Sequence, residues 1–108
     1  MRAPIIISEH GDLVVFEAKE DAEMYLEAID VANGEYVGYD SEGRLLRLTP
    51  AWPHSATITD GESEPSHKDE LSAALSGFFL QLGLPADWVR QASLEEMIDK
   101  AREYRANR

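Results

Sequence analysis

Between residues 71 and 82 the apolar side chains recur with the period of an α-helix. They stand at i, i+3, i+4, i+7, i+8 and i+11, which places them on one helix face. These residues are Leu71, Ala74, Leu75, Phe78, Phe79 and Leu82. Ser66 and Asp69 have the spacing of a capping box before this helix, and Gly83 ends it. Because such a face is buried only against another apolar layer, we expect Phe78 and Phe79 in the core.

Short β-rich runs separated by turn residues precede that helix. The runs are residues 4–8, 13–16, 36–39, 45–49 and, more weakly, 55–59. Gly11 and Gly43 lie in the turns of two predicted hairpins, where a positive φ is needed. Pro50 and Pro53 restrict the last run to a sheet edge or a loop. The sequence therefore predicts an antiparallel sheet of four to five strands.

Two further helices complete the predicted pattern. In residues 20–30, Ala22, Tyr25, Leu26 and Ile29 share one helical face. Near the C-terminal end, Ser93 and Glu96 form a capping box. The helix that follows presents Leu94, Met97, Ile98 and Ala101 on one side.

The order of these elements is ββαβββαα in a chain of 108 residues. Runs of antiparallel strands followed by helices are typical of the α+β class. A length near the commonest size of one domain favours a single modest core. We therefore expect one acidic α+β domain, residues 1–108, with the helices packed on one face of the sheet.

The negative charge is concentrated in the first 42 residues. They contain eleven acidic and two basic residues, and so carry −9 of the net charge of −11. Because self-repulsion of this size destabilises a compact state, its concentration predicts an electronegative surface with a positively charged partner. It argues against direct binding to nucleic acid or to an anionic membrane, since both select for Lys and Arg.

Two features of composition bear on location. The chain has no cysteine, which suits a reducing compartment. No apolar run approaches the ~20 residues that span a bilayer. We therefore expect a cytoplasmic protein.

Acidic residues of the segment 20–30 define the candidate binding surface. Glu20, Glu23, Glu27 and Asp30 fall within roughly 80° of one another on a helix, opposite its apolar face. Met24 lies beside them and supplies an adaptable contact. The predicted partner-binding residues are Glu20, Glu23, Met24, Glu27 and Asp30, with Glu35, Asp40 and Glu42 as a rim.

No group of residues in the sequence has a pattern that indicates a catalytic site. His10, His54 and His67 lack the spacing of a helical metal pair, and we expect no metal and no cofactor. The acids Asp60, Glu62 and Glu64 lack the ligand pattern of a calcium loop and are predicted to be solvated. An enzyme using scattered carboxylates has little support, so we expect a non-enzymatic protein.

A pattern within residues 12–46 resembles a known group of proteins. It includes Val15-Phe16-Glu17, Tyr25-Leu26-Glu27, Gly34-Glu35-Tyr36-Val37 and Glu42-Gly43-Arg44-Leu45-Leu46. It is similar to small acidic immunity proteins of bacterial polymorphic toxin systems. The toxins of these systems are delivered by contact-dependent or type VI secretion. The resemblance implies a protein that binds one cognate toxin domain and blocks it. It implies no catalytic residue.

A second hypothesis comes from a different class. Trp52 and Trp88 stand beside prolines in irregular segments, where a tryptophan either caps the core or anchors an interface. A small adaptor or regulatory module would use these residues or the C-terminal helix. The basic residues near that end also allow a head-to-tail contact between copies. They are Lys100, Arg102, Arg105 and Arg108.

Overall fold

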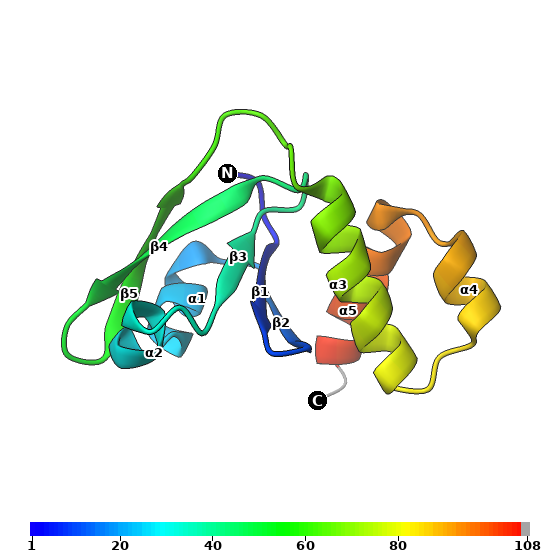
Figure 1. The fold of residues 1–108 in the computed structure, drawn as a ribbon, viewed down its shortest axis with the longest axis horizontal. Helices are drawn as coiled ribbons and strands as arrows, with labels where there is room; N and C mark the ends of the chain where they lie inside the picture. The colour runs from blue at the N-terminus through cyan, green and yellow to red at the C-terminus, as the bar shows by residue number, and fades with distance from the viewer. Residues whose placement is uncertain (107–108) are drawn as a thin grey trace.

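The computed structural model describes residues 1–106, which form a five-stranded sheet and five helices. The strands are β1 (Ile5–Glu9), β2 (Asp12–Phe16), β3 (Val37–Tyr39), β4 (Leu45–Ala51) and β5 (Ser55–Asp60). The helices are α1 (Lys19–Tyr25), α2 (Ala28–Ala32), α3 (Lys68–Gln81), α4 (Ala86–Gln91) and α5 (Leu94–Ala106). Figure 1 shows their arrangement.

The sheet is antiparallel with the strand order β2-β1-β3-β4-β5. This confirms the α+β class and both predicted hairpins. β5 lies at an edge, as the prolines beside it predict. Pro50 pairs with Ala56 inside the β4–β5 hairpin, and Pro53 lies in its turn.

Helices cover both faces of the sheet, so the expectation of helices on one face is wrong. Successive strand residues point to opposite faces. Ile5 and Ile7 pack in the core beneath α1 and α2, whereas Ile6 packs beneath α3, α4 and α5. Figure 1 shows β1 and β2 between these two groups of helices. Strands buried on both sides read as continuous apolar runs.

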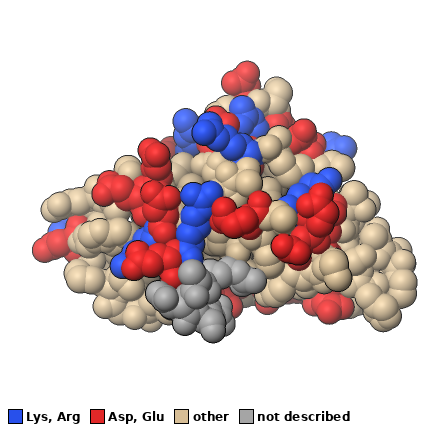
Figure 2. Space-filling model, turned by 180° about the vertical axis from the view of Figure 1, so that it is seen from behind, with Lys and Arg blue, Asp and Glu red and all other residues tan. Residues whose placement is uncertain are grey.

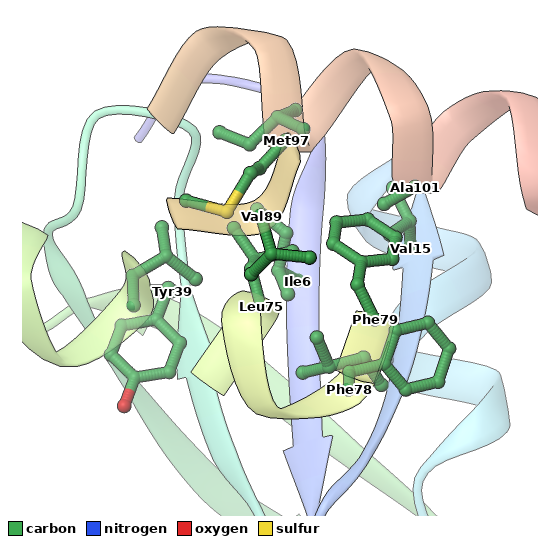
Figure 3. Packing of buried hydrophobic residues seen from close by; sticks show 12 residues of the cluster. Ile6, Val15, Tyr39, Leu75, Phe78, Phe79, Val89, Met97 and Ala101 are labelled. Carbon is green, nitrogen blue, oxygen red and sulfur yellow. The ribbon is translucent and has the colours of Figure 1, made fainter. Parts of the chain in front are cut away.

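The core on the α3 side confirms the predicted aromatic pair. Phe78 and Phe79 are buried, and Figure 3 shows them beside Val15 and Ala101. Trp88 meets Phe79 edge to face, with ring centroids 5.7 Å apart. Trp88 is therefore a partly buried residue that packs against the core.

The two predicted capping boxes have different outcomes. Ser93 and Glu96 form theirs: the Glu96 N–H donates to Ser93 Oγ at 3.1 Å, and the Ser93 N–H donates to Glu96 Oε1 at 3.0 Å. The box of Ser66 and Asp69 does not form, because α3 begins after His67 and has no side-chain cap. Ser66 Oγ instead donates to Glu62 Oε2 at 2.8 Å.

The predicted helix over residues 20–30 is broken into α1 and α2. Leu26 and Glu27 are extended, with ψ of 136° and 130°. The break allows Leu26 and Ala28 both to be fully buried against the sheet. Ile29, expected in the core, is instead 55% exposed. Burial in the tertiary fold thus overrides the straight helical pattern.

The acidic loop between β5 and α3 is a structural connection. Glu62 accepts hydrogen bonds from the Leu45 N–H at 2.8 Å and from the Ser66 hydroxyl at 2.8 Å, and it pairs with His67 Nδ1 at 2.9 Å. The hydrogen bond from Leu45 is the main cause that lowers the pKa of Glu62 to about 2. The prediction that Glu62 is merely solvated is therefore wrong.

Candidate functional site

Asp40, predicted as part of a binding rim, is fully buried. Its Oδ1 accepts the N–H groups of Glu42 at 3.0 Å and Arg44 at 2.9 Å, and its Oδ2 accepts the N–H of Arg2 at 3.1 Å. The Arg44 guanidinium adds a contact of 3.4 Å. Asp40 organises the β3–β4 turn and ties the N-terminal segment to it. It is therefore removed from the candidate surface.

Glu23 is also used by the fold. Its Oε2 accepts the N–H of Ile58 at 2.7 Å and lies 4.0 Å from Lys19 Nζ. Ile58 belongs to β5, an edge strand, and α1 packs against it. A carboxylate that accepts the N–H of an edge strand leaves that N–H unavailable for pairing with a strand of another chain. Glu23 is thus a structural residue that protects the edge of β5.

The other predicted acids are partly engaged and do not form one continuous rim. Glu35 forms an ion pair with His10, whose pKa is raised by this hydrogen bond and charge. Asp30 accepts a hydrogen bond from the Tyr36 hydroxyl at 3.5 Å. Glu42 lies 3.0 Å from the Arg44 guanidinium, beside the buried Asp40 turn. Glu35 therefore belongs to a different local contact from Asp40 and Glu42, which share Arg44.

Three predicted residues remain fully on the surface. Glu20 and Glu27 are exposed, and Met24 is 78% exposed, the largest value among the exposed large apolar residues. Asp21, next to Glu20 in the sequence, is also exposed. We call a set of five exposed side chains of this region the α1–α2 surface. It consists of Glu20, Asp21, Met24, Glu27 and Ile29.

An exposed tryptophan lies near this surface. Trp52 is 62% exposed in the β4–β5 turn, and α2 packs against both strands of that hairpin. Figure 1 shows α2 and the turn at the same end of the molecule. Figure 2, seen from behind, shows acidic and basic side chains next to one another over the middle of the molecule. Few charged side chains lie at its right-hand end, which is the left-hand end of Figure 1. Sequence reasoning raised Trp52 as an anchor but did not connect it with α1 and α2.

The basic residues near the C-terminal end are engaged within the chain. Arg102 Nε lies 3.0 Å from Glu17 Oε2, and Lys100 Nζ lies 3.8 Å from Glu103 Oε1. Arg108 and the side chain of Arg105 lie outside what the structure describes. The described part of this cluster is therefore balanced by acids of the same molecule.

A cavity of about 410 Å³ lies between the N-terminal segment, the β3–β4 turn and α5. Arg2, Lys68 and Arg102 line it together with Glu42, Glu95 and Asp99, so its charges are mixed. Its lining includes no residue of the α1–α2 surface.

On the α1–α2 surface and at the neighbouring Trp52, flexible and aromatic apolar side chains lie in the same region as exposed carboxylates. This combination provides apolar anchors and a polar rim, as in protein–protein interfaces. Among residues 1–106, no three His, Asp or Glu side chains are grouped to hold a metal ion, and no helix has the length and apolar character needed to cross a membrane. In comparisons with known proteins, no family model, curated protein or solved structure matches this chain.

Proposed function

We propose that this protein is an immunity-type inhibitor that binds and neutralises a cognate toxin domain without enzymatic activity. The α1–α2 surface and Trp52 form the docking surface in this proposal. One observation carries it: Met24, Ile29 and Trp52 are 78%, 55% and 62% exposed, in a region that also holds the exposed carboxylates of Glu20, Asp21 and Glu27. Exposed large apolar groups gathered in one region mark interaction sites.

The charge around this surface defines the partner. Residues 17–35 contain seven acidic residues and one basic residue, Lys19. A toxin that acts on nucleic acid or nucleotides has a basic substrate cleft, and an acidic inhibitor associates quickly with such a cleft through electrostatic steering. Met24 and Trp52 then supply apolar burial, which slows dissociation. The proposed occupant is therefore the basic face of a toxin domain.

The resemblance of residues 12–46 to immunity proteins supports the same function. The candidate toxin to be tested in this proposal is the product of a neighbouring gene. Co-expression of the two proteins measures neutralisation as restored growth, and co-purification measures binding. If the neighbouring toxin domain neither co-purifies nor is neutralised, the inhibitor function is refuted.

Kinetics of the purified pair test the surface itself. We expect Glu20→Lys with Glu27→Lys to slow association at least tenfold and to remove most of its salt dependence. Both side chains are exposed. The matched control is Glu64→Lys with Glu95→Lys, which changes the net charge equally at exposed positions outside α1 and α2. Equal effects of the two double variants would assign the steering to net charge and reject the surface.

A further inference from the structure

The cavity of about 410 Å³ beside α5 has walls that the fold holds in place. The Ser41 N–H of the β3–β4 turn donates to the Arg2 carbonyl at 2.9 Å, and the His67 N–H donates to the Gly43 carbonyl at 3.0 Å. These bonds join the N-terminal segment and the start of α3 to the same turn. Small-molecule sites are usually preformed cavities of about 300 to 1,000 Å³. The volume and the fixed walls therefore suit a small ligand.

Apolar side chains form the floor of this cavity. Pro4 and Ile98 line it and are buried, and Leu94 lines it one helical turn before Ile98 on α5. An aliphatic group of a ligand that lies on this floor leaves water and is stabilised by the hydrophobic effect. The floor therefore selects a ligand with an apolar part.

Ion pairs within the chain already engage four of the six charged side chains that line the cavity. Arg102 Nη1 lies 3.4 Å from Asp99 Oδ1, and Arg102 Nε lies 3.0 Å from Glu17 Oε2 outside the cavity. Arg2 Nη1 lies 3.8 Å from Glu42 Oε1, a longer pair. These contacts leave Arg2 the most weakly held of the three basic side chains that have a partner here or nearby.

The remaining two charges, on Lys68 and Glu95, are exposed and opposite in sign. Among the described side chains, neither has an ion-pair or hydrogen-bond partner. Lys68 packs against the β3–β4 turn, because a Cβ built on Gly43 would lie 2.6 Å from Lys68 Cγ. Glu95 stands on α5, four positions before Asp99 and on the same helix face. The cavity thus offers one free cation at the turn and one free carboxylate on α5.

The sum of the charges indicates the class of ligand. Three basic and three acidic side chains line the cavity, so its lining is neutral in a chain of net charge −11. A ligand with several negative charges would meet three carboxylates, and a purely cationic ligand would meet three basic groups. A ligand that bears one charge of each sign pairs with both free groups.

We propose that this cavity binds a small aliphatic zwitterion, of the class of a free amino acid or a dipeptide. The ligand carboxylate pairs with Lys68 Nζ beside Arg2, and the ligand ammonium pairs with the Glu95 carboxylate. The aliphatic side chain packs against Pro4 and Ile98. Hydrogen bonds between charged groups are stronger than neutral ones, so both ends of the ligand contribute to binding. The cavity includes no residue of the α1–α2 surface, so this site is independent of toxin binding.

Titration of the isotope-labelled full chain with leucine and with leucyl-leucine, followed by amide chemical shifts in NMR spectra, tests the site. At least one of the two is expected to bind with a dissociation constant in the millimolar range or below, and the tighter one defines the length of the ligand. Its N-acetylated form lacks the ammonium and its amidated form lacks the carboxylate, so each is expected to bind at least tenfold more weakly. No shift with either ligand at tens of millimolar, or equal binding of a blocked form, overturns the proposal.

Variants that neutralise one charge locate the ligand. Lys68→Gln and Glu95→Gln are each expected to raise the dissociation constant at least tenfold. The matched controls, Lys19→Gln and Glu64→Gln, remove a charge of the same sign at positions that do not line the cavity. The amide spectrum of each variant verifies that it is folded. Equal effects of the cavity and control variants, or ligand-induced shifts confined to α1 and α2, would overturn the placement of the ligand in this cavity.

Discussion

Replacing Asp40 by alanine removes the acceptor that holds the β3–β4 turn and the N-terminal segment together. Three backbone N–H groups, those of Arg2, Glu42 and Arg44, lose their partner. A hydrogen bond to a charged group contributes roughly 1.5 to 3 kcal/mol, and water replaces part of it at half-exposed amides. We therefore expect Asp40→Ala to lower the free energy of unfolding by about 3 to 5 kcal/mol.

Asp40→Asn separates the hydrogen bonds from the charge. An asparagine oxygen placed at Oδ1 keeps the two bonds from Glu42 and Arg44, while its NH₂ group faces the Arg2 N–H as a second donor. We expect a loss of about 1 to 3 kcal/mol, between alanine and the wild type. Urea unfolding followed by circular dichroism and tryptophan fluorescence measures both variants.

A small loss of stability in Asp40→Ala would contradict the structural role of Asp40. If Asp40→Ala lowers the free energy of unfolding by less than about 1 kcal/mol and instead weakens partner binding, Asp40 is a surface contact and the structural role is refuted.

Three further substitutions have defined outcomes. Ser93→Ala removes the capping box of α5 and is expected to cost about 1 kcal/mol in urea unfolding, whereas an unchanged midpoint would mean that the box contributes nothing. Glu23→Ala frees the Ile58 N–H at the sheet edge, so light scattering on mild heating should show faster aggregation than in the wild type; equal rates would contradict the edge role. The pKa of Glu62 is lowered to about 2, so its contribution to stability is complete above the ordinary glutamate pKa and is lost as pH falls from about 4.5 toward 2. The difference in unfolding free energy between wild type and Glu62→Gln should therefore shrink over that pH range, and a constant difference would refute this linkage.

The strands and the long helices were predictable because their patterns are dense. α3 and α5 carry repeated apolar positions over several turns, and proline restricts β5 to an edge. The two-sided burial of β1 also had a signal: Ile5, Ile6 and Ile7 are consecutive and do not alternate with polar residues. Alternation of apolar and polar residues is expected only for a strand with one solvent-exposed face.

The break between α1 and α2 had no local signal. Leu26 and Glu27 both favour helices, and no glycine or proline marks the position. Their extended conformation follows from the burial of Leu26 and Ala28 against strands distant in sequence. The straight-helix assumption consequently placed Ile29 in the core and left it out of the candidate surface.

The roles of the acids were only partly predictable. Asp40 had a signal, because aspartate at the start of a turn accepts N–H groups two residues on. Glu23 had none, since its partner Ile58 is 35 positions away in the chain. A count of charges locates an acidic segment but does not separate acids used by the fold from acids free to bind.

The most direct test of the docking surface is a hydrogen-exchange footprint of this protein in complex with the toxin domain of its neighbouring gene. We predict that slowed exchange on binding concentrates in α1, in α2 and in the turn that carries Trp52. The backbone amides of α3 should exchange at the same rate as in the free protein. Protection confined to α3, α4 or α5, with α1 and α2 unchanged, would contradict the proposed surface.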